Sequence, residues 1–395
     1  MKKIIFILII SLAVTESRGQ ISAGNRVVVD VNTKGLPKKE LVLQDFMDVE
    51  YVALETTDVF LNSGSLKDVG NKYIVIANTQ AQNGDIFIYD RSGKGLRKIN
   101  RRGGGGEEYI DPIMIALDEE NNELFVNDIH SSRIQVYDLH GKFRRTLRHP
   151  KGKGNYYNRI DNYDKNNLIC YDGGNERIAF SLISKRDGSV TREIKIPFQK
   201  KISTTLNYKQ QVESQDPTTT VMSAKSVVPR FSNLMIPYKG NWILSEVSSD
   251  IIYTFLRNYS LRPLIERTPS IQTMNPEAFL FLSLISDRYY FLKAQKKIYD
   301  FKTKKGFPAT SFMYDTQEKA FFEYTVYSAD YTNKREVNID RFRAVNHEIA
   351  TYFTIEPSRL IESLKKGHLK GKLKEIASTL EEDDNPVIML VKYKK

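Results

Sequence analysis

The chain has 395 residues, of which 41% are hydrophobic, 27% charged and 11% aromatic, with 22 Gly, 13 Pro and a single Cys. This composition is that of a folded protein and excludes a disordered, collagen-like or disulfide-stapled chain. The formal net charge of +11 makes the protein basic.

The beginning of the chain has the pattern of an export signal. Lys2 and Lys3 precede an almost wholly apolar run over residues 4–14, and small residues follow it. This is the order of a secretory signal peptide, and the run is about half the ~20 residues that a membrane-spanning helix needs. We therefore expect residues 1–19 to be removed, which lowers the formal charge from +11 to +9. The mature protein is expected to have no transmembrane segment and to be periplasmic or extracellular.

A strand pattern repeats along the chain with the period of a propeller blade. Strands that alternate apolar and polar residues, separated by short turns, follow one another in the same order over residues 73–101 and 123–148. The Tyr-Asp pairs that end at Asp90 and Asp138 lie 48 residues apart. This spacing indicates blades of four antiparallel strands.

The repeat predicts a ring of six blades. Four fainter copies follow, at residues 167–196, 241–257, 288–293 and 348–354. A ring protects its sheet edges when one blade takes strands from both ends of the chain, and residues 49–55 and 386–393 are strand-like segments without a partner of their own. We predict an all-β fold, a six-bladed β-propeller of four-stranded antiparallel blades over residues 46–395, after an N-terminal lead-in over residues 20–45. Two stacked β-sandwiches would explain the strands but not a recurring spacing of 44 to 50 residues.

Two segments interrupt the repeat. Residues 198–240 are rich in Ser, Thr, Gln and Lys and predict a long irregular excursion on one face, a kind of loop that often carries function. Residues 357–380 carry apolar side chains at helical spacing and predict one C-terminal amphipathic helix packed on the propeller. Gly367 and Gly371 predict a bend within it. Its lysines leave a membrane-surface helix as the alternative.

The motifs resemble a known group of proteins. Residues 111–118, 124–128, 133–137 and 141–143, with the Gly-rich lead-in at 103–109, resemble the NHL-type repeat. VEYVALETT at 49–57, RRGGGGEEY at 101–109 and EDDNPVIMLVKY at 382–393 are similar to secreted, TolB-like six-bladed propellers of Gram-negative gut bacteria. This resemblance covers nearly the whole mature chain and implies a propeller outside the cytoplasm. It implies no catalytic residues.

Two clusters are candidates for ligand binding. The Gly-rich segment lacks the Lys-Ser/Thr of a phosphate loop and is interpreted as a connection between blades, whose polar neighbours lie near the axis. A tyrosine pair follows the basic segment 142–153, and aromatic rings beside cations are suited to an acidic glycan or another anionic polymer. The candidate residues are Arg101, Arg102, Glu107, Tyr109, Tyr156 and Tyr157.

Two acid and arginine pairs recur in successive blades. Asp128 and Arg133, and likewise Asp172 and Arg177, flank a strand-to-strand turn with the same separation. A carboxylate and an arginine at such a turn can bind each other and the turn amides. We interpret these four residues as structural.

The sequence contains no catalytic signature. It has no HExxH motif, no Cys/His cluster and no GxSxG motif. We therefore predict no catalytic residues, no metal ligands and no cofactor, although a calcium ion held by acids on the axis stays open. Cys170 lies in an apolar run, which favours a buried, unreactive thiol over a nucleophile.

Three functions are consistent with these observations. The first, which we favour, is a non-enzymatic binding or scaffold propeller, expected to be a monomer, that holds a glycan, a peptide or an envelope protein. The second is a calcium-dependent, lactonase-like hydrolase or a lyase. The third is a structural or sensory envelope component. Nucleic acid is not expected as a partner because the protein is exported.

Overall fold

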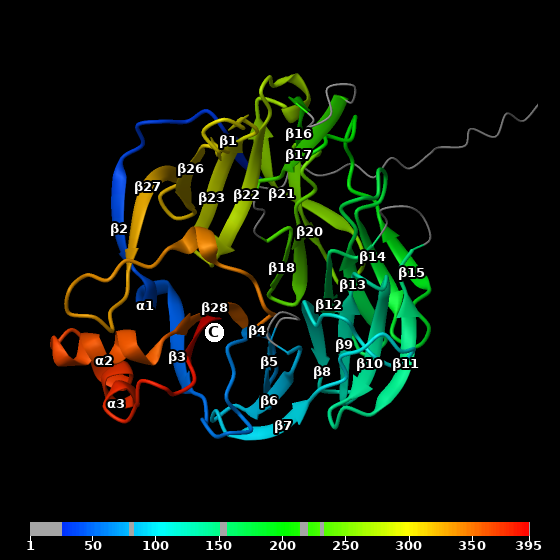
Figure 1. Cartoon of the computed structure of the whole chain (residues 1–395). Coiled ribbons are helices and arrows are strands. Elements are labelled where there is room, and N and C mark those ends of the chain that lie inside the picture. The colour runs from blue at the N-terminus through cyan, green and yellow to red at the C-terminus, as the bar shows by residue number, and fades with distance from the viewer. Residues whose placement is uncertain (1–25, 79–82, 151–155, 214–219, 230–232, 395) are drawn as a thin grey trace, which may run out of the picture.

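The computed structural model describes residues 26–78, 83–150, 156–213, 220–229 and 233–394, and the signal peptide expected over 1–19 lies outside them. The described residues form six sheets arranged as blades around an axis, so the protein is a six-bladed β-propeller (Figure 1). Among the described residues, no helix is long and apolar enough to cross a membrane.

The first three blades are four-stranded meanders. Blade 1 consists of β4 (Ser65–Val69), β5 (Tyr73–Ala77), β6 (Ile86–Asp90) and β7 (Gly95–Ile99). Blade 2 consists of β8 (Met114–Asp118), β9 (Glu123–Asp128), β10 (Arg133–Asp138) and β11 (Phe143–Arg148). Blade 3 consists of β12 (Arg159–Asn162), β13 (Asn167–Tyr171), β14 (Phe180–Ser184) and β15 (Val190–Ile194).

The next two blades have five strands each because the N-terminal segment adds one strand to their outer edges. Blade 4 consists of β18 (Met235–Tyr238), β19 (Asn241–Leu244), β20 (Ile251–Phe255), β21 (Leu261–Thr268) and β1 (Val27–Asp30). Blade 5 consists of β22 (Ala278–Ile285), β23 (Tyr289–Lys296), β26 (Ala309–Asp315), β27 (Ala320–Tyr327) and β2 (Lys38–Val42). The lead-in expected over residues 20–45 is therefore in part sheet, and both added strands run parallel to their neighbours.

Blade 6 closes the ring with strands from both ends of the chain. It contains β28 (Ile349–Ile355), β29 (Val387–Tyr393) and β3 (Met47–Ala53), with β29 in the middle, and the helical turn α1 (Leu43–Phe46) leads into β3. This blade has three regular strands instead of the expected four. Residues 342–346 lie beside β28 without forming a regular strand, and the amides of Val345 and Asn346 both donate to the Ile349 carbonyl at 3.2 Å.

The predicted C-terminal helix is two helices. α2 (Pro357–Lys365) and α3 (Gly371–Ala377) are separated because Gly367 and Gly371 adopt φ of +69° and +51°, in the left-handed region that ends a helix. Buried side chains of both helices, including Leu360 and Leu373, pack with Val387 of β29.

The excursion expected over residues 198–240 contains regular structure. It holds the hairpin of β16 (Leu206–Glu213) and β17 (Thr220–Val227), and its last residues already belong to β18 of blade 4. A second small hairpin, β24 (Tyr299–Asp300) and β25 (Lys305–Gly306), is inserted in blade 5. Two single 3₁₀ turns, Ile271–Thr273 and Ile339–Arg341, complete the described elements.

The core lies between neighbouring blades. Middle strands such as β5 and β6 are buried on both faces, which explains their nearly continuous apolar sequences, because each face is covered by another blade. The clusters around Tyr137 between blades 1 and 2, and around Phe180 between blades 3 and 4, are examples. Buried Asp138 holds a turn of blade 2 by accepting from the amides of His140 and Lys142, both at 2.9 Å.

Candidate functional site

The largest opening in the described structure is a pocket on the propeller axis, called here the axial pocket. Its volume is about 710 Å³. Leu66, Ile115 and Ile160, from the first strands of blades 1, 2 and 3, line it together with Leu234 of blade 4 and Val345 of blade 6. Because five blades contribute to its wall, the ring itself fixes the shape of the pocket.

The axial pocket opens on the face from which the insertions leave the ring. Residues 201–205 and Val228, at the base of the β16–β17 hairpin, line the pocket. Tyr208 of that hairpin stacks on Phe301 of the blade 5 insertion, with 5.0 Å between the ring centroids. We call this side of the molecule the insertion face.

Two charged groups on the pocket wall pair with each other. The Arg159 Nε and Nη2 atoms donate to the two carboxylate oxygens of Asp161, at 2.7 and 3.1 Å, and Nη2 also donates to the Ala344 carbonyl at 3.0 Å. Burial raises the pKa of Asp161, opposed by the charges of Arg159 and Arg343. This pair links blade 3 to blade 6 across the axis.

Two other cations on the wall have no acidic partner within hydrogen-bond distance. The Lys67 ammonium donates to the Ile113 carbonyl at 3.0 Å. Burial lowers the pKa of Lys67 to about 8, with Arg343 acting in the same direction and Asp111 against it. Among the bonds between described residues, Arg343 takes part only through its backbone amide, which donates to the Thr351 hydroxyl at 2.9 Å.

Aromatic and hydroxyl groups complete the pocket. Tyr156 is 36% exposed on its wall. Tyr352 donates its hydroxyl to the Leu66 carbonyl at 2.8 Å, which fixes its ring. Ser203 and Thr204 add polar groups at the base of the hairpin. The pocket therefore offers cations, a partly exposed ring and hydroxyls within one space.

A second pocket, called here the lower pocket, lies further along the axis. Its volume is about 370 Å³, and Asp161 and Val345 line both pockets. No lysine or arginine is among the described residues that line it, whereas Asp68, Glu119 and Glu348 are. Burial raises the pKa of Asp68 to about 7.

The acids around the lower pocket are used by the fold. Glu119 of blade 2 accepts hydrogen bonds from three consecutive amides of blade 1, those of residues 71–73, at 2.8 to 3.0 Å. The carboxylate of Glu348 pairs with Lys392 at 3.0 Å. Asp68 accepts from the Leu117 amide at 2.8 Å, which joins blades 1 and 2.

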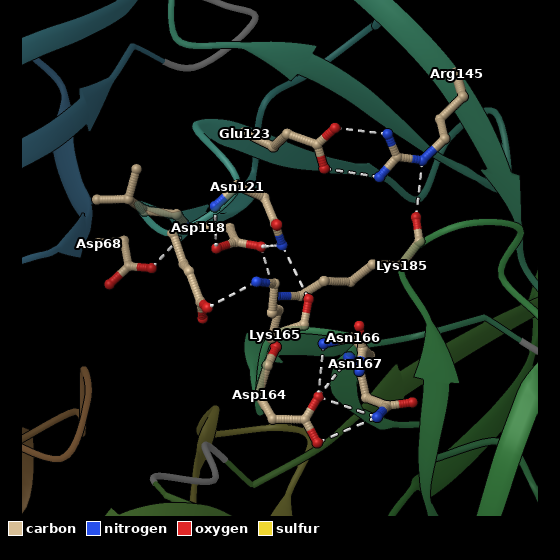
Figure 2. A network of polar contacts seen from close by, with 12 residues as sticks. Asp68, Asp118, Asn121, Glu123, Arg145, Asp164, Lys165, Asn166, Asn167 and Lys185 are labelled. Carbon is tan, nitrogen blue, oxygen red and sulfur yellow. Dashed lines mark hydrogen bonds and ion pairs between the residues drawn. The ribbon is translucent and has the colours of Figure 1, made fainter.

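A polar network on the same side joins blades 2 and 3 (Figure 2). The Lys185 ammonium lies 2.5 Å from the Asp118 carboxylate, and both side chains are almost fully buried. Lys185 also donates to the Asp164 carbonyl at 2.6 Å, and Arg145 makes a two-pronged pair with Glu123 at 2.6 and 2.7 Å. These contacts hold neighbouring blades together.

The first predicted binding cluster lies in a connection between blades 1 and 2 and not in the axial pocket. Tyr109 is fully buried, and its hydroxyl donates to the Gly84 carbonyl at 2.8 Å. Exposed Arg101 donates from Nε to the Gly141 carbonyl at 2.9 Å. Arg102 and Glu107 are also exposed, and the Glu107 carbonyl accepts from the Tyr137 hydroxyl at 2.7 Å.

The two residues of the predicted tyrosine pair point into different environments. Tyr156 lines the axial pocket, as described above. Tyr157 is 2% exposed and lies in the core between blades 2 and 3, with its ring against His149 at a centroid distance of 5.4 Å. Alternation along an extended segment separates the two rings, so only Tyr156 is placed to meet a ligand.

The recurrent acids hold their turns, but the expected acid and arginine pairs are absent from the hydrogen bonds and ion pairs of the described residues. Asp128 accepts from the amides of Ile110 and His130 at 2.9 and 3.2 Å, and Asp172 accepts from the amides of residues 174 and 175 at 2.9 and 3.1 Å. Arg133 instead donates to the Gly105 and Glu108 carbonyls, at 2.9 and 3.0 Å. Arg177 is exposed.

Sequence reasoning did not find the charged residues of the axial pocket. Lys67, Arg159 and Arg343 come from three blades, and their separation in the chain carries no motif. The available signal was a charge inside a short first strand of a blade, as in SLKDV and RIDN. Among the described residues, no group of three or more His, Cys, Asp or Glu is placed to hold a metal ion, and the absence of a metal stays a prediction.

The ring of blades around a lined axial pocket defines the class of protein as a six-bladed β-propeller. The chain belongs to the family DUF4934, a domain of unknown function, whose model matches residues 26–392. No curated protein has significant sequence similarity to the chain.

Solved structures show the same fold. The crystal structure of a protein from Bacteroides fragilis, described as exported, has a TM-score of 0.56 at 14% identity and covers 91% of this chain and 100% of that one. A DUF4221 protein from Bacteroides vulgatus has a TM-score of 0.45 at 10% identity, over 89% and 99% of the two chains. Virginiamycin B lyase from Staphylococcus aureus has a TM-score of 0.37 at 11% identity, over 87% and 99%. The last two are too distant to carry an argument about this protein.

Proposed function

We propose that this protein is an exported, non-enzymatic binding propeller that holds its ligand in the axial pocket. The carrying observation is a cavity of about 710 Å³ whose wall comes from five blades and from the base of an inserted hairpin. Concave sites of this size with a few polar groups are typical of ligand binding. The predicted signal peptide and the likeness to an exported Bacteroides fragilis protein support export.

The dimensions of the pocket favour one part of the expected ligand range. A cavity of this volume accommodates a small molecule or the end of a polymer, whereas a folded envelope protein would contact only its rim. We therefore place a glycan or peptide segment in the pocket and keep the NHL-type and TolB-like resemblance as a statement about architecture.

Thermal unfolding of the chain 20–395 tests this function. Ligands that bind the native state raise the unfolding midpoint, so we expect a shift from at least one member of a panel of neutral and acidic glycan fragments and short peptides. EDTA and added calcium should leave the midpoint unchanged. A fall with EDTA that calcium restores would instead support the metal-dependent enzyme.

A matched pair of tyrosine variants locates the site. Tyr156→Ala should reduce the ligand-induced shift because Tyr156 lines the pocket, whereas Tyr259→Ala should not, because Tyr259 has a similar exposure of 41% and is not among the lining residues. Equal loss in both variants, or in neither, would contradict binding in the axial pocket.

A further inference from the structure

The arginine at the centre of the axial pocket differs from its neighbours in having no partner. Arg159 on the same wall is held by Asp161, and Lys201 is held by Glu246 at 3.0 Å. Arg343 is exposed to the pocket, and no bond among the described residues involves its guanidinium. An arginine that served only the fold would be expected to pair with an acid or a carbonyl.

A second cation lies within electrostatic range of this arginine. The positive charge of Arg343 lowers the pKa of Lys67, which shows that the two groups are near neighbours. Lys67 uses one of its three donors on the Ile113 carbonyl. The charged groups that face Lys67 are Arg343 and Asp111, and the other charged side chains on the pocket wall are Arg159, Asp161, Glu176 and Lys201.

This arrangement is suited to an anion. Two cations that repel each other are both stabilised when a negative group binds between them. A carboxylate matches the planar donor fork of an arginine and can accept from an ammonium at the same time.

The rest of the pocket favours a sugar as the carrier of that group. Tyr156 provides a partly exposed ring, and Ser203 and Thr204 provide hydroxyls on the same wall. An aromatic ring offers an apolar face for a sugar ring, and hydroxyls can exchange hydrogen bonds with it. We infer that the axial pocket recognises an acidic glycan, with a uronic-acid carboxylate bound between Arg343 and Lys67 and its sugar rings beside Tyr156. This inference rests on the proposed function.

Calorimetric titration of the chain 20–395 with tri-galacturonate and with its neutral methyl ester tests the inference, because the two probes differ only in charge. We expect tri-galacturonate to bind at least about 10-fold more tightly than the ester. Arg343→Gln should weaken binding of the acid by about 10- to 100-fold and leave binding of the ester unchanged. Arg186→Gln is the control, because its side chain is 89% exposed and outside the pocket.

The pH dependence gives an independent readout. Lys67 is charged below its pKa of about 8, so affinity for the acid should fall as the pH is raised from 7 to 9. Lys67→Met should bind the acid more weakly at pH 7 and lose this dependence. A pH profile that is the same in both proteins would contradict a role of Lys67 in holding the anion.

Three outcomes separate this inference from the function on which it rests. Equal binding of acid and ester, lost in Tyr156→Ala but not in Arg343→Gln, would overturn the carboxylate site and support a pocket for neutral glycans. Binding of a peptide through its free C-terminus, abolished by C-terminal amidation and by Arg343→Gln, with no glycan binding, would overturn the glycan and keep the carboxylate. Failure of both galacturonate probes while another panel member binds in a Tyr156-dependent manner would overturn only the inference.

Discussion

The two ends of the propeller axis carry opposite charges and differ in how those charges are used. The axial pocket presents Arg343 without a partner and Lys67 bound only to a carbonyl. The acids of the lower pocket are bound by amides and lysines of neighbouring blades, as Glu119 and Glu348 show. Polar groups at the lower end therefore hold the ring together, whereas those at the insertion face are left available to a ligand.

The largest effect is expected at the lower end, where a buried ion pair joins blades 2 and 3. Lys185→Met leaves the Asp118 carboxylate buried without its ammonium partner, and removal of one member of such a pair costs about 3–5 kcal/mol. Urea unfolding should show this loss in the free energy of unfolding. Lys165→Met is the control, because its pair with Glu120 is 3.4 Å long and exposed, and should change stability by less than about 1 kcal/mol.

A change of opposite sign is expected in the axial pocket. Lys67 is charged at pH 7 although burial lowers its pKa to about 8, so the charged form costs stability. Lys67→Met should raise the free energy of unfolding by about 2 kcal/mol at pH 7. The gain should vanish above pH 10, where the lysine is neutral in both the folded and the unfolded chain. A loss of stability at pH 7 would show that Lys67 serves the fold and would break the contrast between the two ends.

The smallest effect concerns Asp68, which lies between the two regions. Its folded pKa is raised from 3.8 to about 7, so its contribution to stability is present below pH 4 and is lost as the pH rises towards 7. Asp68→Asn should therefore raise the free energy of unfolding by about 1 kcal/mol at pH 8 and have little effect at pH 4. Unfolding curves of both proteins at the two pH values measure the difference. A gain of the same size at both would contradict a neutral carboxyl in the folded protein.

The sequence predicted the ring better than its edges. Blade 1 and blade 2 were readable because Asp90 and Asp138 end equivalent strands and hold equivalent turns, so period and structure coincide. β1 and β2 were not readable, because a strand of four or five residues on an outer edge takes its stability from its partner and not from its own pattern. The irregular segment at 342–346 has no strand pattern to detect.

The candidate site was predictable only in part for a related reason. Tyr156 was found because an aromatic residue beside a basic segment is a local pattern. Arg343 and Lys67 approach each other only when blade 6 closes beside blade 1, and no local pattern reports a contact made by ring closure. Tyr109 and Tyr157 carry the same residue type as Tyr156, but alternation of the backbone places their rings in the core.

The N-terminal segment has a consequence for the order in which the chain can fold. β1, β2 and β3 pair with three successive blades, and Val27 finds its partner at Ile265 while Met47 finds its partner at Tyr393. Contacts between residues so distant in the chain form slowly, because a long loop must be closed first. The strands that are synthesised first are thus among the last to be secured, and the ring can be latched only after the final residues of the chain are available.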